Sequence, residues 1–559
     1  MKILIIGGVA TGLKAAAKAR RCDPRAEITV VEKGDLISYG ACGLPYYVSA
    51  EVNALEDLMK TAAGVLRTPA YFHDVKDIKI LTRTQALKID RQKKKITVWN
   101  LDTDAESILV YDKLVIATGA SPLKLDVPGV GLQNIYQFWH PHDAKAIRQG
   151  METGKYGNAV IIGAGLVGME MMEALQIWTN NVTIVEMKEN IFPAFLDKEI
   201  AGLVEKYVRE EGIQLVTGEH VVRFTGDPEV TAVETDKRTI PADLVILALG
   251  VRPNVELAQS AGLKIGTTGA IEVDAALQTS DPDIFAGGDC VENSNLVSKK
   301  KVFAPMGSTA NKHGRIIGEN LTGGRLRFKG VLNTVIVKVI DLNVGKTGIT
   351  EREAKELGYD YITVVTAGHD RPHYMQDANL ISIKLIADAK TRKVLGLQAV
   401  GKGDVAKRID VVASVLTLGG TIDNLFDIDL SYAPPYNSPI DNVAVAANAL
   451  MNKIQGRFNG ISAFDAKEMM DNKKAIFLDV RTANEYKEVK LAEGDNIKHI
   501  PLGELRNRCN ELSKDDEIIA FCKISLRGYE AEGILEGEQF TKVKVLEGGI
   551  FSWPFDTRK

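Results

Sequence analysis

Short apolar runs that end in glycine recur along the first half of the chain. They lie within residues 2–21, 114–120, 158–175, 242–254 and 283–290. A short continuous apolar run followed by glycine is typical of a buried parallel strand that ends in a tight turn. In 2–21 and 158–175 the turn is followed by residues that favour a helix, so both segments predict a strand, a turn and a helix.

Each of these two segments is followed by a second strand that carries an acid near its end. The strand at 28–33 contains Glu32, and the later strand ends at Glu186. A strand, glycine turn, helix and strand make the βαβ unit that binds nucleotides. We therefore expect two such units, one inserted into the other. The first domain takes residues 1–113 and 249–324, and the second takes residues 114–248.

The pattern changes at about residue 325. Apolar and polar positions alternate in 331–340 and 380–388, which indicates strands and predicts a mixed α/β domain over 325–454. Near its end lies a Pro-rich loop, 431–442, which cannot be the interior of a helix or strand. Residues 460–559 form a separate module of alternating strands and helices.

Composition excludes several classes of function. The chain has 559 residues and a formal net charge of −4, which indicates several globular domains and no broad nucleic-acid-binding surface. No apolar run approaches the about 20 residues of a membrane span, and we expect no signal peptide. The five cysteines lack metal-ligand spacing, so we expect no metal site and a reducing cytoplasm.

The second βαβ unit carries a complete dinucleotide fingerprint. Gly163, Gly165 and Gly168 stand between the predicted strand and helix in a G-x-G-x-x-G pattern. These glycines permit the tight turn, the approach of the backbone to a pyrophosphate and close helix packing. Glu186 lies where a carboxylate accepts hydrogen bonds from a ribose 2′-hydroxyl and repels a 2′-phosphate, so NADH is favoured over NADPH. Lys188 nearby leaves NADPH open.

The first unit is less regular and is completed by other segments. Its glycines are Gly7, Gly8 and Gly12, with Val9 at the usual middle position. Glu32 takes the place of the ribose acid, and Asp289 at a strand end suits a flavin ribityl or pyrophosphate contact. The combination predicts FAD in the first domain and a nicotinamide in the second.

These motifs together carry a family resemblance. The chain to about residue 450 resembles the single-cysteine branch of the FAD-dependent pyridine nucleotide-disulfide oxidoreductases, most closely the coenzyme A disulfide reductases. The tail resembles a rhodanese domain, and some fusions of this kind are NADH-dependent persulfide reductases. The most specific stretches are SYGACGLPYY, IIGAGLVGME, DIFAGGD, SYAPPY and CKISLRG. The implied fold is α/β, with two nested Rossmann-like FAD and NAD domains, a mixed α/β dimerisation domain and a C-terminal rhodanese α/β domain.

The resemblance implies a redox-active thiol at Cys42. Its motif holds no second cysteine, so its disulfide would form with a substrate thiol or a sulfane sulfur, and the thiolate would be the nucleophile. Tyr374 and Tyr432 match tyrosines that reach the reactive sulfur from the second subunit of a homodimer. A phenol there can protonate a leaving thiolate.

The remaining contacts are assigned by the same resemblance. The FAD set is Gly7, Gly12, Glu32, Lys33, Ala117, Thr118, Gly119, Thr279, Asp289 and Gly307. The NADH set is Gly163, Gly165, Gly168, Glu186 and Gly250. The coenzyme A set, for a substrate or a bound mixed disulfide, is Lys14, Lys18, Arg21, Ser38, Lys76 and Asn311. For each basic residue, a plain solvated charge stays an open alternative.

The tail resembles a rhodanese active-site loop. Cys522 at a strand end is followed by four residues and Arg527, and the backbone N–H groups of such a loop stabilise an anionic thiolate or persulfide. Arg527 would tie the loop or the anion. Asp479 and Arg481 match a structural acid-and-base pair at a strand end. An inactive, structural rhodanese module is the alternative.

The predicted function is NADH-dependent reduction of coenzyme A persulfide, polysulfide sulfur or coenzyme A disulfide, with Cys522 handing sulfur on. Two alternatives stay open. A peroxide- or oxygen-reducing flavoenzyme of the same fold would use Cys42 as a sulfenic acid. A redox- or sulfur-sensing protein would bind the same molecules without turnover.

Overall fold

The computed structural model describes residues 1–491 and 496–558. The chain forms two compact units, and each is described by itself. The first unit is made of residues 1–163, 171–185 and 220–331. The second is made of residues 164–170, 186–219 and 332–559.

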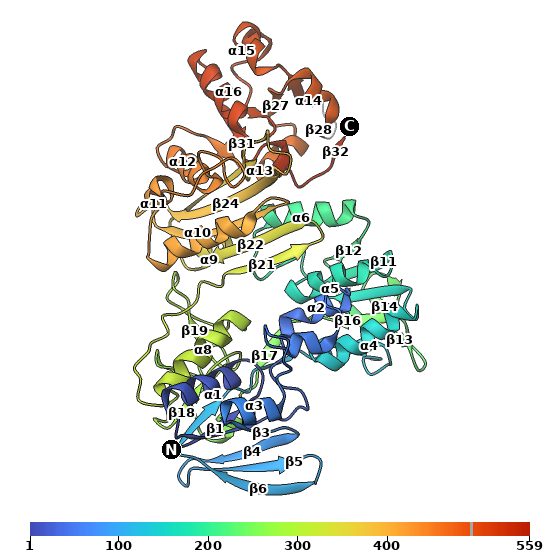
Figure 1. Ribbon diagram of the computed structural model, residues 1–559. Coiled ribbons are helices and arrows are strands. Elements are labelled where there is room, and N and C mark those ends of the chain that lie inside the picture. The colour runs from blue at the N-terminus through green and yellow to red at the C-terminus, as the bar shows by residue number, and fades with distance from the viewer. Residues whose placement is uncertain (492–495, 559) are drawn as a thin grey trace. The chain divides into compact units, whose positions relative to one another are not determined.

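The first unit contains the predicted first nucleotide-binding sheet. Its parallel strands run in the order β18-β7-β1-β2-β3. Figure 1 labels β18, β1 and β3 of this sheet. Their bounds are β1 Lys2–Ile6, β2 Glu27–Val31, β3 Lys79–Leu81, β7 Lys113–Ile116 and β18 Ile284–Ala286. Strands β1, β2, β7 and β18 confirm the strands predicted from the apolar runs in 2–21, 28–33, 114–120 and 283–290.

Two helices of this domain pack closely against each other. They are α1 (Thr11–Cys22) and α8 (Gly307–Asn320). A Cβ on Gly314 or Gly318 of α8 would come within 2.6 Å or 2.5 Å of backbone oxygens of α1. Glycine at these two positions therefore allows the two backbones to approach, and the Thr11 hydroxyl donates to the Ala310 carbonyl at 2.9 Å.

The inserted domain has its own parallel strands, β11, β10, β16 and β9, in that order. Their bounds are β9 Ile135–Tyr136, β10 Asn158–Ile162, β11 Asn181–Glu186 and β16 Leu244–Leu247. Helix α4 (Pro141–Glu152) precedes β10, and α5 (Leu166–Gln176) follows it. The strand–turn–helix predicted within 158–175 is thus confirmed. The unit also contains two antiparallel three-stranded sheets: β4 Thr84–Asp90, β5 Lys95–Asn100 and β6 Ala105–Val110, then β13 Val221–Gly226, β14 Val230–Thr235 and β15 Thr239–Pro241.

The second unit contains an antiparallel sheet in the order β21-β22-β25-β24-β23. Its strands are β21 Val335–Val339, β22 Leu342–Gly348, β23 Tyr361–His369, β24 Leu380–Asp388 and β25 Val394–Gly401. The helices of this part are α6 Lys198–Glu210, α9 Glu351–Glu356, α10 Val405–Thr417, α11 Ile422–Asp427 and α12 Asn442–Ile454. Residues 428–441 form no helix or strand, as the prolines predict.

A second sheet of this unit forms the C-terminal module. Its parallel strands run in the order β26-β31-β30-β27-β29. They are β26 Gly460–Ile461, β27 Ile476–Asp479, β29 Ile497–His499, β30 Ile518–Phe521 and β31 Val543–Leu546. Ile519 and Phe521 pack into one apolar cluster, whereas Ile518 and Ala520 pack into another. Alternate residues of β30 therefore belong to two apolar cores. The helices of this module are α13 Ala463–Asp471, α14 Ala483–Glu488, α15 Leu502–Arg508 and α16 Leu526–Gly537.

Two searches of the described residues bear on function. No helix among residues 1–491 and 496–558 is long and apolar enough to cross a membrane. Within the same residues, no cluster of three or more His, Cys, Asp or Glu side chains is arranged to hold a metal ion.

Candidate active site

Cys42 lies at the start of two helices. It sits in the 3₁₀ turn Ala41–Gly43, directly before α2 (Leu44–Val48), and it is exposed. Its Sγ is also 3.8 Å from the place that a Cβ on Gly307, the first residue of α8, would take. The N-terminus of a helix carries partial positive charge, which favours a thiolate over a thiol. This position suits the nucleophilic role that the sequence predicts for Cys42.

The glycines of the first nucleotide loop are required by close backbone contacts. Gly7 has a φ of +109°, and a Cβ there would lie 2.1 Å from the Ala117 carbonyl oxygen. A Cβ on Gly12 would lie 1.9 Å from the Gly7 carbonyl oxygen. The Glu32 carboxylate accepts from the backbone N–H groups of Gly8 and Gly34, both at 2.7 Å. The protein's own hydrogen bonds therefore hold the glycine loop against Glu32.

Asp289 is the clearest sign of a polar ligand in this domain. Within the described residues its Oδ1 is buried and has no hydrogen-bond partner. Burial raises the pKa of Asp289 to about 6. Buried polar atoms are nearly always satisfied in a complete protein, so a hydroxyl or phosphate-linked group of FAD fits here. The residues of the first domain therefore fit FAD.

Other predicted FAD residues use their side chains within the protein. The Thr118 hydroxyl donates to the Asn254 carbonyl at 2.7 Å, and the Thr279 hydroxyl donates to the Ile284 carbonyl at 2.9 Å. Gly119 has a φ of +65° with open space around it, and Lys33 is exposed. Thr118 and Thr279 shape the strand ends beside the predicted site, while Gly119 and Lys33 stay available to a ligand.

His313 is a buried group of this domain that no sequence motif singles out. Its Nδ1 accepts the Gly288 N–H at 3.1 Å, and burial lowers its pKa to about 4. The histidine is therefore neutral at physiological pH and supports the turn just before Asp289.

The second fingerprint has the backbone that its glycines predict. Gly163 has a φ of +106°, and a Cβ there would lie 2.4 Å from the Ala248 carbonyl oxygen. Gly165 is surrounded by open space, which leaves the backbone accessible, and Gly168 is buried in α5. Gly250 has a φ of +95°. This arrangement suits a dinucleotide pyrophosphate at the start of α5.

The predicted basic contacts for coenzyme A are not equally available. Lys14 and Arg21 on α1 are exposed, whereas Lys18 pairs with Glu319 at 2.8 Å. Lys76 lies over the Tyr71 ring at 5.7 Å. An anionic ligand on this helix face would therefore meet Lys14 and Arg21 directly and would compete with Glu319 for Lys18.

Of the two predicted polar contacts, one is buried. Ser38 is buried and has a φ of +55°, with its N–H donating to the Gly8 carbonyl at 2.9 Å. Asn311 is exposed and donates from its Nδ2 to the Gly307 carbonyl at 2.9 Å. Asn311 lies one turn beyond Gly307, and so on the end of α8 that contains the Cys42 contact.

The two predicted catalytic tyrosines belong to the second unit and are exposed. Tyr374 is 64% exposed and Tyr432 is 51% exposed. Tyr374 follows β23 in the loop that leads to β24, and Tyr432 lies in the Pro-rich loop before α12. Two more large side chains of that loop, Tyr436 and Ile440, are also exposed. Exposed aromatic side chains gathered on loops are typical of a surface that meets another molecule.

Cys522 directly follows β30 (Ile518–Phe521) and is fully buried. Its carbonyl accepts the Ile550 N–H at 2.9 Å, and the Lys523 carbonyl accepts the Phe551 N–H at 3.0 Å. The loop then enters α16 through Ser525, whose φ is +82°. The backbone of the predicted rhodanese loop is thus fixed directly after the cysteine.

Arg527 is held by a partner that the sequence prediction missed. Its two terminal nitrogens donate to the Glu485 carboxylate at 2.7 and 2.6 Å. The hydrogen bond from Arg527 lowers the pKa of Glu485 to about 2, and the same pair raises the pKa of Arg527. A visible signal was Thr482 three residues before Glu485, because this spacing forms a helix capping box. The one pair that the sequence does predict here, Asp479 and Arg481, is buried and bidentate, with contacts of 2.6 to 3.1 Å.

The fold and these sites define a class: a two-dinucleotide oxidoreductase with an attached sulfurtransferase-type module. The family model for pyridine nucleotide-disulphide oxidoreductase matches residues 1–306, and the model for the dimerisation domain of that family matches 334–444. A rhodanese-like domain matches residues 462–554. The chain belongs to the pyridine nucleotide-disulfide oxidoreductases, whose members use FAD and NAD(P)H, and it carries a rhodanese-like domain.

Three similar proteins extend the comparison. The NAD(P)H coenzyme A polysulfide/persulfide reductase of Pyrococcus horikoshii is 35% identical over 449 residues, which is 80% of this chain and 98% of the relative. The structure of a NAD-dependent persulfide reductase from A. fulgidus has a TM-score of 0.94 at 45% identity and covers 99% of this chain and 100% of that one. A Bacillus anthracis CoADR-RHD in its reduced form has a TM-score of 0.90 at 32% identity and covers 99% and 97%.

Proposed function

We propose that this enzyme uses NADH to reduce the sulfur–sulfur bond of coenzyme A persulfide, polysulfide or coenzyme A disulfide. The observation that carries the proposal is the pairing of two thiols on one chain. Cys42 stands at a helix start in the nucleotide-binding unit, and Cys522 stands at the mouth of a rhodanese loop. The relatives named for coenzyme A persulfide, polysulfide and disulfide reduction support the choice of acceptor.

The overall reaction balances without a further reactant. A persulfide RSSH, NADH and one proton give RSH, hydrogen sulfide and NAD⁺, and a disulfide gives two thiols instead. FAD, when bound in the first domain, passes the two electrons from the nicotinamide to sulfur. The Cys42 thiolate attacks the thiol-side sulfur of the persulfide, so that hydrosulfide leaves and Cys42 is left in a mixed disulfide with coenzyme A. Two electrons and a proton then release the thiol and restore the thiolate.

Tyr374 and Tyr432 would act on the leaving sulfur in a homodimer. We place the tyrosines of one protomer against Cys42 of the other, where a phenol can donate a proton to the departing thiolate. The match to the family's dimerisation domain supports the dimer, as does the exposure of both rings. Lys14, Arg21 and Asn311 would bind the phosphates and polar groups of coenzyme A.

Cys522 would take sulfane sulfur from a donor and carry it as a persulfide. Its burial in the loop protects such a persulfide from water, and Arg527 stands five residues on, held by Glu485. The persulfide would then pass to coenzyme A, which presents it to Cys42. In this scheme the rhodanese module feeds the reductase.

The test is anaerobic NADH oxidation by the full chain, with coenzyme A persulfide and coenzyme A disulfide compared and released sulfide assayed. We expect turnover on the persulfide with one sulfide per NADH. The Cys42→Ser variant should lose at least about a thousandfold of this rate, while Cys22→Ser, at an exposed thiol of the same unit, should keep it. Cys522→Ser should keep the rate on supplied coenzyme A persulfide and lose it on sulfane donors. An absence of turnover on every sulfur acceptor would instead favour a redox- or sulfur-sensing protein.

A peroxide- or oxygen-reducing enzyme is the second candidate, because other relatives carry the name NADH oxidase. Such an enzyme needs no sulfur carrier, so the rhodanese-like domain favours the first proposal. The rate of NADH oxidation with oxygen distinguishes the two candidates. An oxidase would reduce oxygen with NADH faster than it reduces any persulfide.

A further inference from the structure

The loops that carry the two tyrosines have exposed tips and buried bases. Tyr374 lies in the loop of residues 370–379, and Tyr432 lies in the loop of residues 431–441. Both rings are exposed, but Asp370 at the base of the first loop and Asn437 near the end of the second are each 1% exposed. Each loop is therefore anchored by a polar residue below the surface.

The first loop is closed by its own ends. The Asp370 N–H donates to the Asn379 carbonyl, and the Asn379 N–H donates to Asp370 Oδ1, both at 2.9 Å. Arg371 binds the Asp370 carboxylate and also pairs with Asp377. Burial by itself raises the pKa of Asp370, but the N–H groups of Asn379 and Asp404 and the Arg371 guanidinium outweigh it and lower the pKa. Asp370 is thus a buried carboxylate that fixes the neck of the loop.

The second loop is closed by Asn437 and Asp441. The Asn437 side chain donates to the Ser431 carbonyl at 3.4 Å, and its N–H donates to the Ala433 carbonyl at 3.1 Å. Asp441 accepts the Val443 N–H at 2.9 Å and so caps α12. Tyr432 lies between Ser431 and Ala433, the two residues that Asn437 holds.

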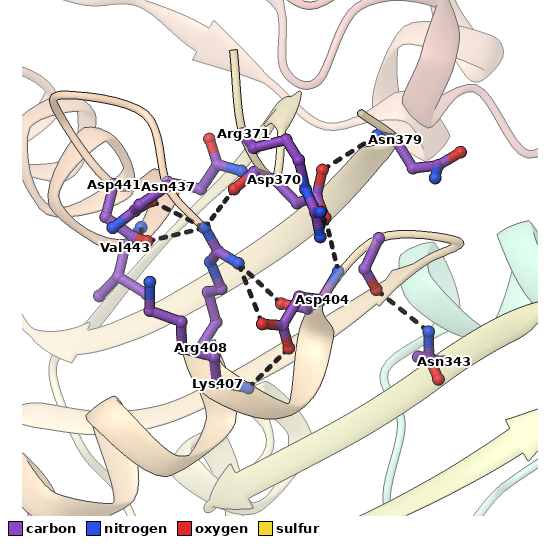
Figure 2. A network of polar contacts seen from close by, with 12 residues as sticks. Asn343, Asp370, Arg371, Asn379, Asp404, Lys407, Arg408, Asn437, Asp441 and Val443 are labelled. Atoms are coloured by element: carbon purple, nitrogen blue, oxygen red, sulfur yellow. Dashed lines mark hydrogen bonds and ion pairs between the residues drawn. The ribbon is translucent and has the colours of Figure 1, made fainter. Parts of the chain in front are cut away.

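One guanidinium joins the two loop bases. Arg408, on the buried side of α10, is 1% exposed. Its Nη2 donates to the Asp370 carbonyl at 2.7 Å and to Asn437 Oδ1 at 3.0 Å, and it lies 2.8 Å from Asp441 Oδ2. Its Nη1 donates to the Asp404 carbonyl at 2.9 Å. Figure 2 shows Arg408 between these groups, with Asp370 on one side and Asn437 and Asp441 on the other.

The geometry of this junction suits arginine better than lysine. A planar guanidinium presents several donors in fixed directions, whereas a lysine ammonium is a single point charge on a flexible stem. The junction is buried, so solvent cannot replace a lost contact. Loss of the fork would leave Asp441 without its cation and would free the neck of each loop to move separately.

We propose that Arg408 is a positioning residue that holds the loops of Tyr374 and Tyr432 at a fixed spacing. The inference rests on the proposed function, in which those tyrosines donate a proton to the departing thiolate. Arg408 touches neither ring. It acts through Asp370 on one loop and Asn437 on the other, and a shift of about an ångström in a catalytic group is enough to slow a reaction substantially.

The test compares Arg408→Lys with Arg392→Lys in the full-length dimer. Arg392 lies in the same domain and pairs with Asp423 at 3.1 Å on the surface, so it is a matched arginine outside the junction. We expect Arg408→Lys to lower kcat/KM for coenzyme A disulfide about tenfold. Reduction of an artificial acceptor that takes electrons directly from the flavin should stay unchanged, and Arg392→Lys should match the wild type in both assays. Circular dichroism, flavin content and dimer mass show that each variant is folded.

A double-mutant cycle separates positioning from a general structural effect. In a background in which both tyrosines are phenylalanine, Arg408→Lys should cost less than about twofold. The same tenfold loss in that background would overturn the positioning role, as would an Arg408→Lys variant with wild-type kcat/KM. If the two tyrosine substitutions alone cost nothing, the tyrosine assignment in the proposed function fails and the positioning role fails with it. Additive losses overturn the positioning role alone.

Discussion

Two carboxylates, Glu32 and Glu186, make the same pair of contacts in the two nucleotide-binding domains. Glu32 accepts the N–H groups of Gly8 and Gly34. Glu186 accepts those of Ala164 and Lys188, at 2.8 and 2.9 Å. In each case one oxygen holds the glycine loop and the other holds the residue two positions on. Each oxygen keeps a second lone pair, which a ribose hydroxyl can use.

At the residue scale, Glu186 should decide between NADH and NADPH. Glu186→Ser removes the charge that repels a 2′-phosphate, while the exposed Lys188 remains to attract one. We expect the ratio of kcat/KM for NADH over that for NADPH to fall at least about tenfold. Glu189→Ser, which removes a nearby exposed carboxylate, should leave the ratio unchanged. An unchanged ratio in Glu186→Ser would show that the discrimination lies elsewhere.

Glu485 should make the rhodanese module sensitive to acid. Its pKa is about 2 in the folded chain and 4.5 ordinarily, because Arg527 binds the charged form. A lowered pKa means that the charged form stabilises the fold above pH 4.5 and that this stability is lost as the pH falls toward 2. We expect Glu485→Gln to unfold at lower denaturant concentration than the wild type at pH 6, with a difference that shrinks on acidification through this window. A difference that is constant with pH would exclude the ion pair as its cause.

At the scale of elements, the sequence predicted what depends on local pattern. Strand β10, helix α5 and the positive φ of Gly163 all follow from a contiguous stretch of chain. The pair of Glu485 and Arg527 joins positions 42 residues apart. The buried contacts of Arg408 likewise join loops that are distant in the sequence, so no local pattern predicts them.

Strand β24 shows how a pattern can mislead. Residues 380–388 alternate, and an alternating strand normally turns its polar face to water. Here Ser382 and Lys384 are buried on that face. Lys384 bonds Glu199 at 2.7 Å and also binds Glu351 and Asp197. Burial alone lowers the pKa of Lys384, but these carboxylates outweigh it and raise the pKa. The polar face of β24 is therefore buried, because residues distant in the sequence pair with its polar side chains.

The loop around Cys522 depends on one glycine of the neighbouring turn. Gly549 has a φ of +61°, and a Cβ there would lie 2.5 Å from the Cys522 carbonyl oxygen. We expect Gly549→Ala to destabilise the module by about 2 kcal/mol and to lower sulfur transfer from thiosulfate. NADH oxidation with coenzyme A disulfide should be retained. Gly456→Ala is the control, because Gly456 has a φ of +68° but nothing near its Cβ position. Equal losses in both variants would mean that backbone strain, and not the contact with Cys522, is responsible.

At the scale of the whole molecule, the rhodanese module is joined to the dimerisation sheet within the second unit. The Glu547 carboxylate accepts the Val365 N–H of β23 at 2.8 Å and binds Lys453 of α12. The Ser552 hydroxyl lies 2.7 Å from that of Ser382 on β24. Glu547 and Ser552 flank Ile550 and Phe551, which hold the Cys522 loop. The segment that supports the Cys522 loop is therefore the segment that fixes the module to the sheet.

This junction should control how firmly the module is held. Glu547 is buried, so Glu547→Ala breaks a buried ion pair and leaves the Val365 N–H without its acceptor, a loss of about 3 kcal/mol of stability. The exposed Arg457, between α12 and β26, then becomes a more frequent site of trypsin cleavage because local opening precedes cleavage. We expect cleavage after Arg457 to accelerate at least about fivefold and the Val365 amide to exchange faster with deuterium. Glu536→Ala, on the exposed surface of α16, should change neither rate. If Glu547→Ala leaves both rates at their wild-type values, the module is held by the remaining contacts and Glu547 is dispensable to the junction.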